Sequence, residues 1–178
     1  MFFPFGKKKP AAPARAKKLS PAEKWQAATR DSQQHLKAGE LGLYRNDLFT
    51  MAGVHKAEGR RDDELRLLLF VCYLDFCPFS SLTDYRYFLE NKDWPVPGGI
   101  IAPGVITRIN SAAKALGLSP SDVEQLFCRE VRADMVPAQV MTVQGCAGLV
   151  RMSMEGKRAE AEKALNRETS RFVKAHRR

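Results

Sequence analysis

The stretch from Leu65 to Cys77 constrains the fold more than any other part of the chain, because only Arg66 and Asp75 interrupt its apolar residues. Acidic residues stand just before it, at positions 62–64, where negative charge stabilises the first turn of a helix. The length and the acidic start favour a helix over the alternative, a buried strand. A helix that is apolar on all sides has to be covered on several sides. We therefore predict that this segment is the central helix of the fold.

Helix signals recur along the rest of the chain and predict an all-α fold of seven to eight helices in a compact helical-hairpin bundle. Ser20, Pro21 and Glu23 combine a helix cap, a proline in the first turn and a capping box, and Gly39 is placed to end that helix. A short strand at residues 140–143 is the alternative within the penultimate helix. Further helices are expected over residues 43–58, 62–77, 79–91, 105–116, 119–131, 137–154 and 155–176.

Residues 93–104 hold three prolines and three glycines, which exclude regular structure and predict an ordered apolar loop or a hinge. Eight of the sixteen aromatic residues lie in the adjoining stretch, residues 70–94, and most of them are expected to fill the core. Trp94, in the loop, is instead predicted to be an exposed anchor for a protein partner, together with Tyr85 and Tyr87. Exposed aromatic residues often dominate protein interfaces.

The charge of the chain is concentrated at its two ends. The 178 residues include 29 lysines and arginines and 20 acidic residues, for a formal charge of +9. Residues 1–18 contain six basic residues and no acid, residues 151–178 contain nine and four, and the stretch between contains 14 and 16. The pattern predicts a flexible, disordered basic arm at residues 1–19, a single helical domain at residues 20–154, and a polar, basic C-terminal helix at residues 155–178.

The basic ends allow several interpretations. Runs of charge usually keep a surface solvated and the protein soluble. They also bind polyanions without sequence preference, so nonspecific nucleic-acid binding is an alternative. The arm's contacts would come from five lysines: Lys7, Lys8, Lys9, Lys17 and Lys18. A third interpretation is attachment to an anionic membrane surface through Phe2, Phe3 and Phe5 beside these lysines. No segment approaches about 20 consecutive apolar residues, so no transmembrane segment is predicted.

Residues 48–76 have the pattern of a paired helical repeat. Leu48 and Ala52 are apolar or small in the first helix, Gly59 follows at the turn, and Leu68 lies on the inner face of the second helix. The pattern resembles a single tetratricopeptide-like helical hairpin. This resemblance implies two antiparallel helices that are used for protein–protein docking. It covers one hairpin and does not extend to the whole chain.

Residues 109–127 have the spacing of a helix-turn-helix, with the small Ala113 at the helix crossing and Gly117 at the turn. This second resemblance implies a helix, beginning after Ser119, that reads the major groove of DNA. Between residues 122 and 134, however, four acidic residues accompany two arginines. An acidic helix is repelled by phosphates, so DNA reading is an alternative and not the leading interpretation.

Sequence patterns of catalysis are missing. The chain contains no phosphate-binding or dinucleotide-binding glycine motif, no zinc-protease helix and no nucleophile elbow. His55, on an apolar helix face, is interpreted as a satisfied core histidine and not as a base. The cysteines and histidines lack the close spacing of a metal site: Cys72, Cys77, Cys128, Cys146, His35, His55 and His176. We expect no enzyme activity, no cofactor and no metal, and reduced thiols in a cytoplasmic protein.

These observations lead to one main interpretation and one alternative. The chain is expected to be a non-enzymatic, cytoplasmic, adaptor-like helical module that binds an unidentified protein partner through the hairpin of residues 48–76 and the loop of Trp94. The alternative is a nucleic-acid-binding protein that uses its basic termini and the helix-turn-helix-like segment 109–127.

Overall fold

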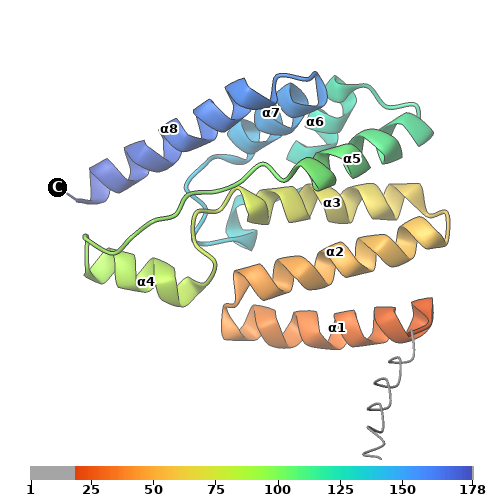
Figure 1. Ribbon diagram of the computed structural model, residues 1–178, viewed down its shortest axis with the longest axis horizontal. Coiled ribbons are helices and arrows are strands. Elements are labelled where there is room, and N and C mark those ends of the chain that lie inside the picture. Colours follow the sequence, from red (N-terminus) through yellow and green to blue (C-terminus); the bar gives the residue numbers. More distant parts are fainter. Residues whose placement is uncertain (1–18, 178) are drawn as a thin grey trace, which may run out of the picture.

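The structure is a computed structural model that describes residues 19–177, and Figure 1 shows them as a stack of helices. No strand occurs in this part of the chain, which confirms the predicted all-α class and excludes the strand considered at residues 140–143. The predicted arm of residues 1–19 lies outside the described residues except for Leu19. The described residues form eight α-helices and one 3₁₀-helix: α1 Pro21–Ala38, α2 Leu41–Ala57, α3 Arg61–Asp75, α4 Leu82–Glu90, α5 Pro103–Ala115, α6 Pro120–Glu130, η1 Ala133–Met135, α7 Val143–Met154 and α8 Arg158–His176.

Helix α3 is the central helix of the fold. It forms an antiparallel stack with α1 and α2, and it lies between α2 and α5 (Figure 1). Helix α6 covers a further part of its surface. Large side chains of α3 are almost completely buried, among them Leu65, Leu68, Leu69 and Tyr73. The prediction that the apolar segment is covered on several sides is therefore confirmed.

The ends of several helices follow capping signals that are visible in the sequence. The hydroxyl of Ser20 accepts a hydrogen bond from the backbone N–H of Glu23, whose side chain accepts one from the N–H of Ser20. Gly39 ends α1 with a φ of 74°, a conformation that favours glycine because it has no Cβ. The predicted capping box and the predicted end of the first helix are confirmed.

Three helices begin at least three residues later than predicted: α4, α7 and α8, which begins at Arg158 and not at residue 155. A side-chain cap explains the first two. The hydroxyl of Ser81 caps α4, so this helix is shorter than the predicted range of residues 79–91. The hydroxyl of Thr142 caps α7, so residues 137–142 lie outside the helix that was predicted to begin at residue 137. In both cases a serine or threonine that bonds to the backbone of the next turn sets the first helical residue.

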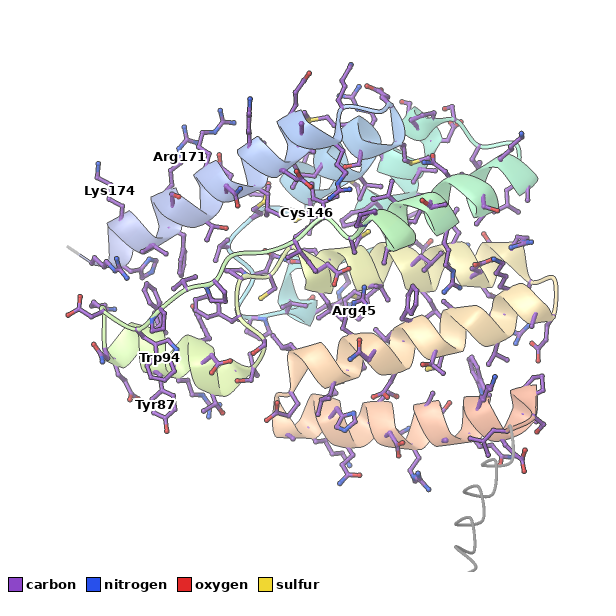
Figure 2. The ribbon with its side chains drawn as sticks, in the orientation of Figure 1. Arg45, Tyr87, Trp94, Cys146, Arg171 and Lys174 are labelled. Atoms are coloured by element: carbon purple, nitrogen blue, oxygen red, sulfur yellow. The ribbon has the colours of Figure 1, made fainter. Side chains whose placement is uncertain are left out.

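Two carboxylates of α3 are buried, and each is paired with arginines. Nε and Nη2 of Arg45, from α2, donate to the two carboxylate oxygens of Asp75 at 2.7 and 2.9 Å (Figure 2). The carboxylate of Glu64 accepts from Arg61 at 2.7 Å and from Arg108, in α5, at 2.9 and 3.1 Å. Burial raises the pKa of Asp75, and the hydrogen bonds and charge of Arg45 oppose this shift. The pairs join α2, α3 and α5 into one unit.

Phe49, on α2, lies between two of these arginines. The guanidinium carbon of Arg45 is 5.0 Å from the centre of the Phe49 ring, and that of Arg108 is 4.6 Å from it. Both contacts are cation–π interactions, which strengthen where water is excluded. The ring therefore supports both buried ion pairs from one place.

We expect Arg45→Met to lower the free energy of unfolding by about 3–5 kcal/mol, because it leaves the buried Asp75 carboxylate without a partner. The double variant Arg45→Met/Asp75→Leu should recover most of this loss, since both charges disappear together. Chemical denaturation followed by circular dichroism measures both. As a control, Arg30→Met breaks an exposed pair with Asp31 and should cost less than about 1 kcal/mol. A double variant no more stable than Arg45→Met would contradict the account.

His55 is buried, but it is not the satisfied core histidine that the sequence predicted. Its ring lies against Trp25 with the ring centroids 4.7 Å apart, and its Nδ1 has no hydrogen-bond partner among the described residues. Burial lowers the pKa of His55, and the positive charge of Arg60 lowers it further; nearby carboxylates oppose the shift in part. The folded state therefore favours the neutral ring.

Because the unfolded chain binds a proton at His55 more readily than the folded chain, the folded state should lose stability as the pH falls below about 6.5. His55→Phe and His55→Leu remove the titrating group. Their loss of unfolding free energy between about pH 7.5 and about pH 5.5 should be smaller than that of the parent chain. Denaturation curves at the two pH values make the comparison, and equal losses in all three chains would rule the explanation out.

Candidate functional site

An aromatic cluster joins the C-terminal half of α8 to α4, which lies beneath it in Figure 1. The ring of Phe172, on α8, contacts the rings of Phe79, Phe88 and Tyr85 with centroid distances of 6.2, 5.7 and 6.5 Å. The ring of His176, one turn further along α8, lies against that of Phe172 with the ring centroids 4.1 Å apart. A helix of nine residues is too short to be stable by itself, so this cluster holds α4 on the body of the molecule.

The three predicted partner-binding residues fall into two groups. Tyr87 and Trp94 lie together with ring centroids 5.4 Å apart, and Tyr87 projects from the side of α4 that faces away from α8 (Figure 2). Tyr87 is 50% exposed, whereas Trp94 is partly buried against the core. Tyr85 packs on Phe79 at 5.1 Å within the aromatic cluster. Residues two apart on a helix point about 200° apart, which separates Tyr85 from Tyr87.

Two hydrogen bonds hold the loop that carries Trp94 on its N-terminal side. The backbone N–H of Trp94 donates to the carbonyl oxygen of Asn91 at 2.9 Å. Nε of Arg177, just after α8, donates to the carbonyl oxygen of Lys92 at 2.7 Å. Arg177, near the C-terminal end of the described residues, thus holds the start of this loop in place.

The far part of the same loop crosses the end of α3 at close range. The backbone N–H of Ile100 donates to the carbonyl oxygen of Asp75 at 2.7 Å. A Cβ atom on Gly99 would lie 2.3 Å from the carbonyl oxygen of Phe76, so no other residue fits there without a shift of the backbone. Of the two predicted descriptions of residues 93–104, these contacts favour the ordered loop over the hinge.

A hollow of about 200 Å³ adjoins Trp94. Asp84 is the charged residue among the described residues that line it, and its carboxylate accepts a hydrogen bond from the hydroxyl of Ser80 at 2.7 Å. The hollow therefore combines an apolar wall, rich in proline and aromatic side chains, with an acidic rim. Its lining residues are Pro78, Phe79, Ser80, Asp84, Trp94, Pro95 and Pro97.

The residues of the tetratricopeptide-like pattern contribute to the core. Leu48, Ala52, Leu68 and Val71 are all buried, and they lie on the antiparallel pair α2 and α3. The part of this hairpin that meets the candidate site is the end of α3, where the Trp94 loop crosses it.

The helix-turn-helix-like segment corresponds to α5 and α6, but the two helices have different main partners. Helix α5 packs on α3, and α6 packs on α7. The acidic residues of α6 have structural partners: Asp122 accepts from the backbone of Ser119, and Glu124 pairs with Arg151 at 2.9 Å. The predicted nucleic-acid or membrane contacts Lys7, Lys8, Lys9, Lys17 and Lys18 lie outside the described residues.

The three buried cysteine thiols are unsuited to nucleophilic chemistry. Burial raises the pKa of Cys77 to about 11 and that of Cys146 to about 12, and it raises the pKa of Cys72 well above its ordinary value. Thiols in such surroundings stay protonated at neutral pH. Within residues 19–177, no three or more histidine, cysteine or acidic side chains are grouped so that they could hold a metal ion.

One groove was not predicted from the sequence. It has a volume of about 350 Å³ and lies between the start of α7 and the middle of α8, with Met141, Leu149 and Met152 along its wall. Gly145 and Gly148 leave room for it on the surface of α7. The sequence feature that could have predicted this groove is a pair of glycines three residues apart inside a helix. Glycine weakens a helix and has no side chain to fill the space beside it, so such a pair suggests a gap on the helix surface.

The comparisons with known proteins add no assignment. No protein-family model, no curated protein and no solved structure matches the chain. Among the described helices, none combines the length and the apolar character that crossing a membrane requires.

We expect Gly99→Ala to displace the Trp94 loop, because its methyl group would collide with the backbone at the end of α3. The variant should lose about 1–3 kcal/mol of unfolding free energy and change the fluorescence of Trp94. Gly104→Ala is the matched control, since a Cβ there meets nothing within 4 Å and alanine favours the first turn of α5. A Trp25→Phe background isolates the Trp94 signal. Equal behaviour of the two variants would contradict the close crossing.

Proposed function

We propose that the chain is a non-enzymatic, cytoplasmic helical module that binds a protein partner, with Tyr87 and Trp94 at the centre of its binding surface. The observation that carries the proposal is the contact between a half-exposed tyrosine and a tryptophan on a loop that is fixed at several points. Tyrosine and tryptophan are enriched among the residues that dominate interfaces. Because both rings are held before binding, little conformational entropy is lost when a partner covers them.

The tetratricopeptide-like hairpin of residues 48–76 is the scaffold of this proposed module. Its inner side chains are buried, so they stabilise the fold, while the end of α3 supports the loop of Trp94 through the crossing at Gly99. A rigid support of this kind favours precise presentation of a binding surface.

The thiols support the cytoplasmic part of the proposal. All four cysteines are free, and three of them are buried: Cys72, Cys77 and Cys146. Reducing compartments keep thiols unpaired, whereas secreted proteins commonly form disulfides.

Nonspecific nucleic-acid binding is the alternative, and the observation in its favour is the basic outer side of α8. Arg171 and Lys174 point away from the body of the molecule there (Figure 2). Glu168 accepts from Arg171 at 2.8 Å and lies 3.5 Å from Arg167, so part of this charge is neutralised. Since α6 is also acidic, protein binding has the stronger support.

Trp94→Ala and Tyr87→Ala should each weaken binding of the partner by ten-fold or more, since loss of a central aromatic residue costs about 2 kcal/mol or more. The partner is captured by cross-linking in a cell extract, identified by mass spectrometry, purified and titrated by calorimetry against each variant. Circular dichroism checks the fold. Leu116→Ala removes an exposed apolar side chain at the far end of α5 and should leave the affinity unchanged. Unchanged affinity in both aromatic variants would refute the proposed surface.

A further inference from the structure

The first 18 residues carry a sequence that fits the hollow beside Trp94. They contain six basic residues and no acidic one, and they include Pro10-Ala-Ala-Pro13 followed by Arg15. Two prolines three residues apart favour the polyproline II conformation, in which they fall on the same edge of the chain. Segments of this kind bind in grooves that are lined by aromatic side chains.

The hollow beside Trp94 has the complementary chemistry. Its wall is formed by Trp94, Phe79 and prolines, and its rim carries the Asp84 carboxylate. In polyproline II, Arg15 follows Pro13 by about 6 Å. A proline against Trp94 would thus bring the arginine within range of Asp84, which lines the same hollow.

The Asp84 carboxylate is the feature that favours a basic ligand at this place, because it is the charged residue among the described residues that line the hollow. The other charges nearby do not line it. They are Glu90, Asp93, Arg86, Lys92, which lies over the ring of Phe88 at 5.8 Å, and Arg177, which donates to the carbonyl oxygen of Lys92.

The arm is too short to place its motif in the hollow of its own chain. Helix α1 is about 27 Å long, and its first residue, Pro21, is at the end that lies farthest from α4 (Figure 1). Helix α4 begins at the other end, where the N–H of Leu82 donates to the carbonyl oxygen of Gly39. From Pro21 back to Arg15, which has to meet Asp84, the chain spans at most about 22 Å when fully stretched. This reach is shorter than α1, so the hollow that the segment occupies belongs to another molecule.

We propose that the segment Pro10–Arg15 of one copy of this chain binds in the Trp94 hollow of a second copy. This inference rests on the proposed function, because it uses Trp94 of the proposed surface and names an occupant for the hollow beside it. The contact is heterologous, so one molecule offers the arm and the other the hollow, and longer assemblies form as the concentration rises. Added salt weakens it, because ions in solution screen the attraction between Arg15 and the Asp84 carboxylate.

Two full-length variants test the inference by complementation. Pro10→Ser/Pro13→Ser/Arg15→Ser removes the arm motif and keeps the hollow, while Trp94→Ala removes the hollow and keeps the arm. In sedimentation velocity the parent chain should self-associate with rising concentration, and each variant alone should stay monomeric. An equal mixture of the two should form a complex of one copy of each, which cannot extend further. Pro4→Ser, an arm substitution outside the motif, should associate like the parent.

The outcomes are distinct. A parent chain that stays monomeric, a Trp94→Ala chain that associates like the parent, or a mixture that does not associate would each overturn the inference. If the mixture fails while Trp94→Ala still weakens the protein partner in calorimetry, the inference about the arm is wrong and the proposed function stands. If Trp94→Ala changes neither measurement, both are wrong. Circular dichroism of each variant excludes unfolding as the cause.

Discussion

The burial of α3 on several sides is the constraint on which the other elements depend. Such a helix can carry a carboxylate only if another element supplies a cation, because an isolated buried charge is very costly. Arg45 and Arg108 meet this need from α2 and α5, and both rest on Phe49. The positions of α2 and α5 are thus set by electrostatics as well as by packing. The C-terminal end of α3, where Asp75 lies, then receives the Trp94 loop at its backbone.

The C-terminal helix shows how a polar segment can be structurally essential. Most residues of α8 are exposed, yet Ala161, Leu165 and Thr169 are buried on one side, and Phe172 completes the cluster beneath the last turns. This narrow apolar stripe is enough to hold α8 on the molecule, because the surfaces that it packs against provide large aromatic side chains. The candidate binding surface therefore depends on residues that are more than 80 positions apart in the sequence, such as Lys92 and Arg177.

The sequence predicted the local features well and the distant contacts poorly. The cap at Ser20, the end of α1 at Gly39 and the central helix were all visible, because they depend on residues a few positions apart. The starts of α4 and α7 were missed, since serine and threonine caps compete with helix-like patterns upstream. The pairing of Arg45 with Asp75 and the contact of Tyr87 with Trp94 depend on which surfaces meet, and hydrophobic periodicity does not encode this. The separation of Tyr85 from Tyr87, in contrast, follows from helix geometry alone.

The contact between Arg177 and the carbonyl oxygen of Lys92 has a consequence for the order in which the molecule is made. During translation, α4 and the Trp94 loop leave the ribosome well before α8 is synthesised. Until then Phe172 and His176 are absent from the aromatic cluster, and the short α4 has little to hold it. The Tyr87–Trp94 surface thus gains this support only after α8 has been synthesised, although its own residues emerge much earlier.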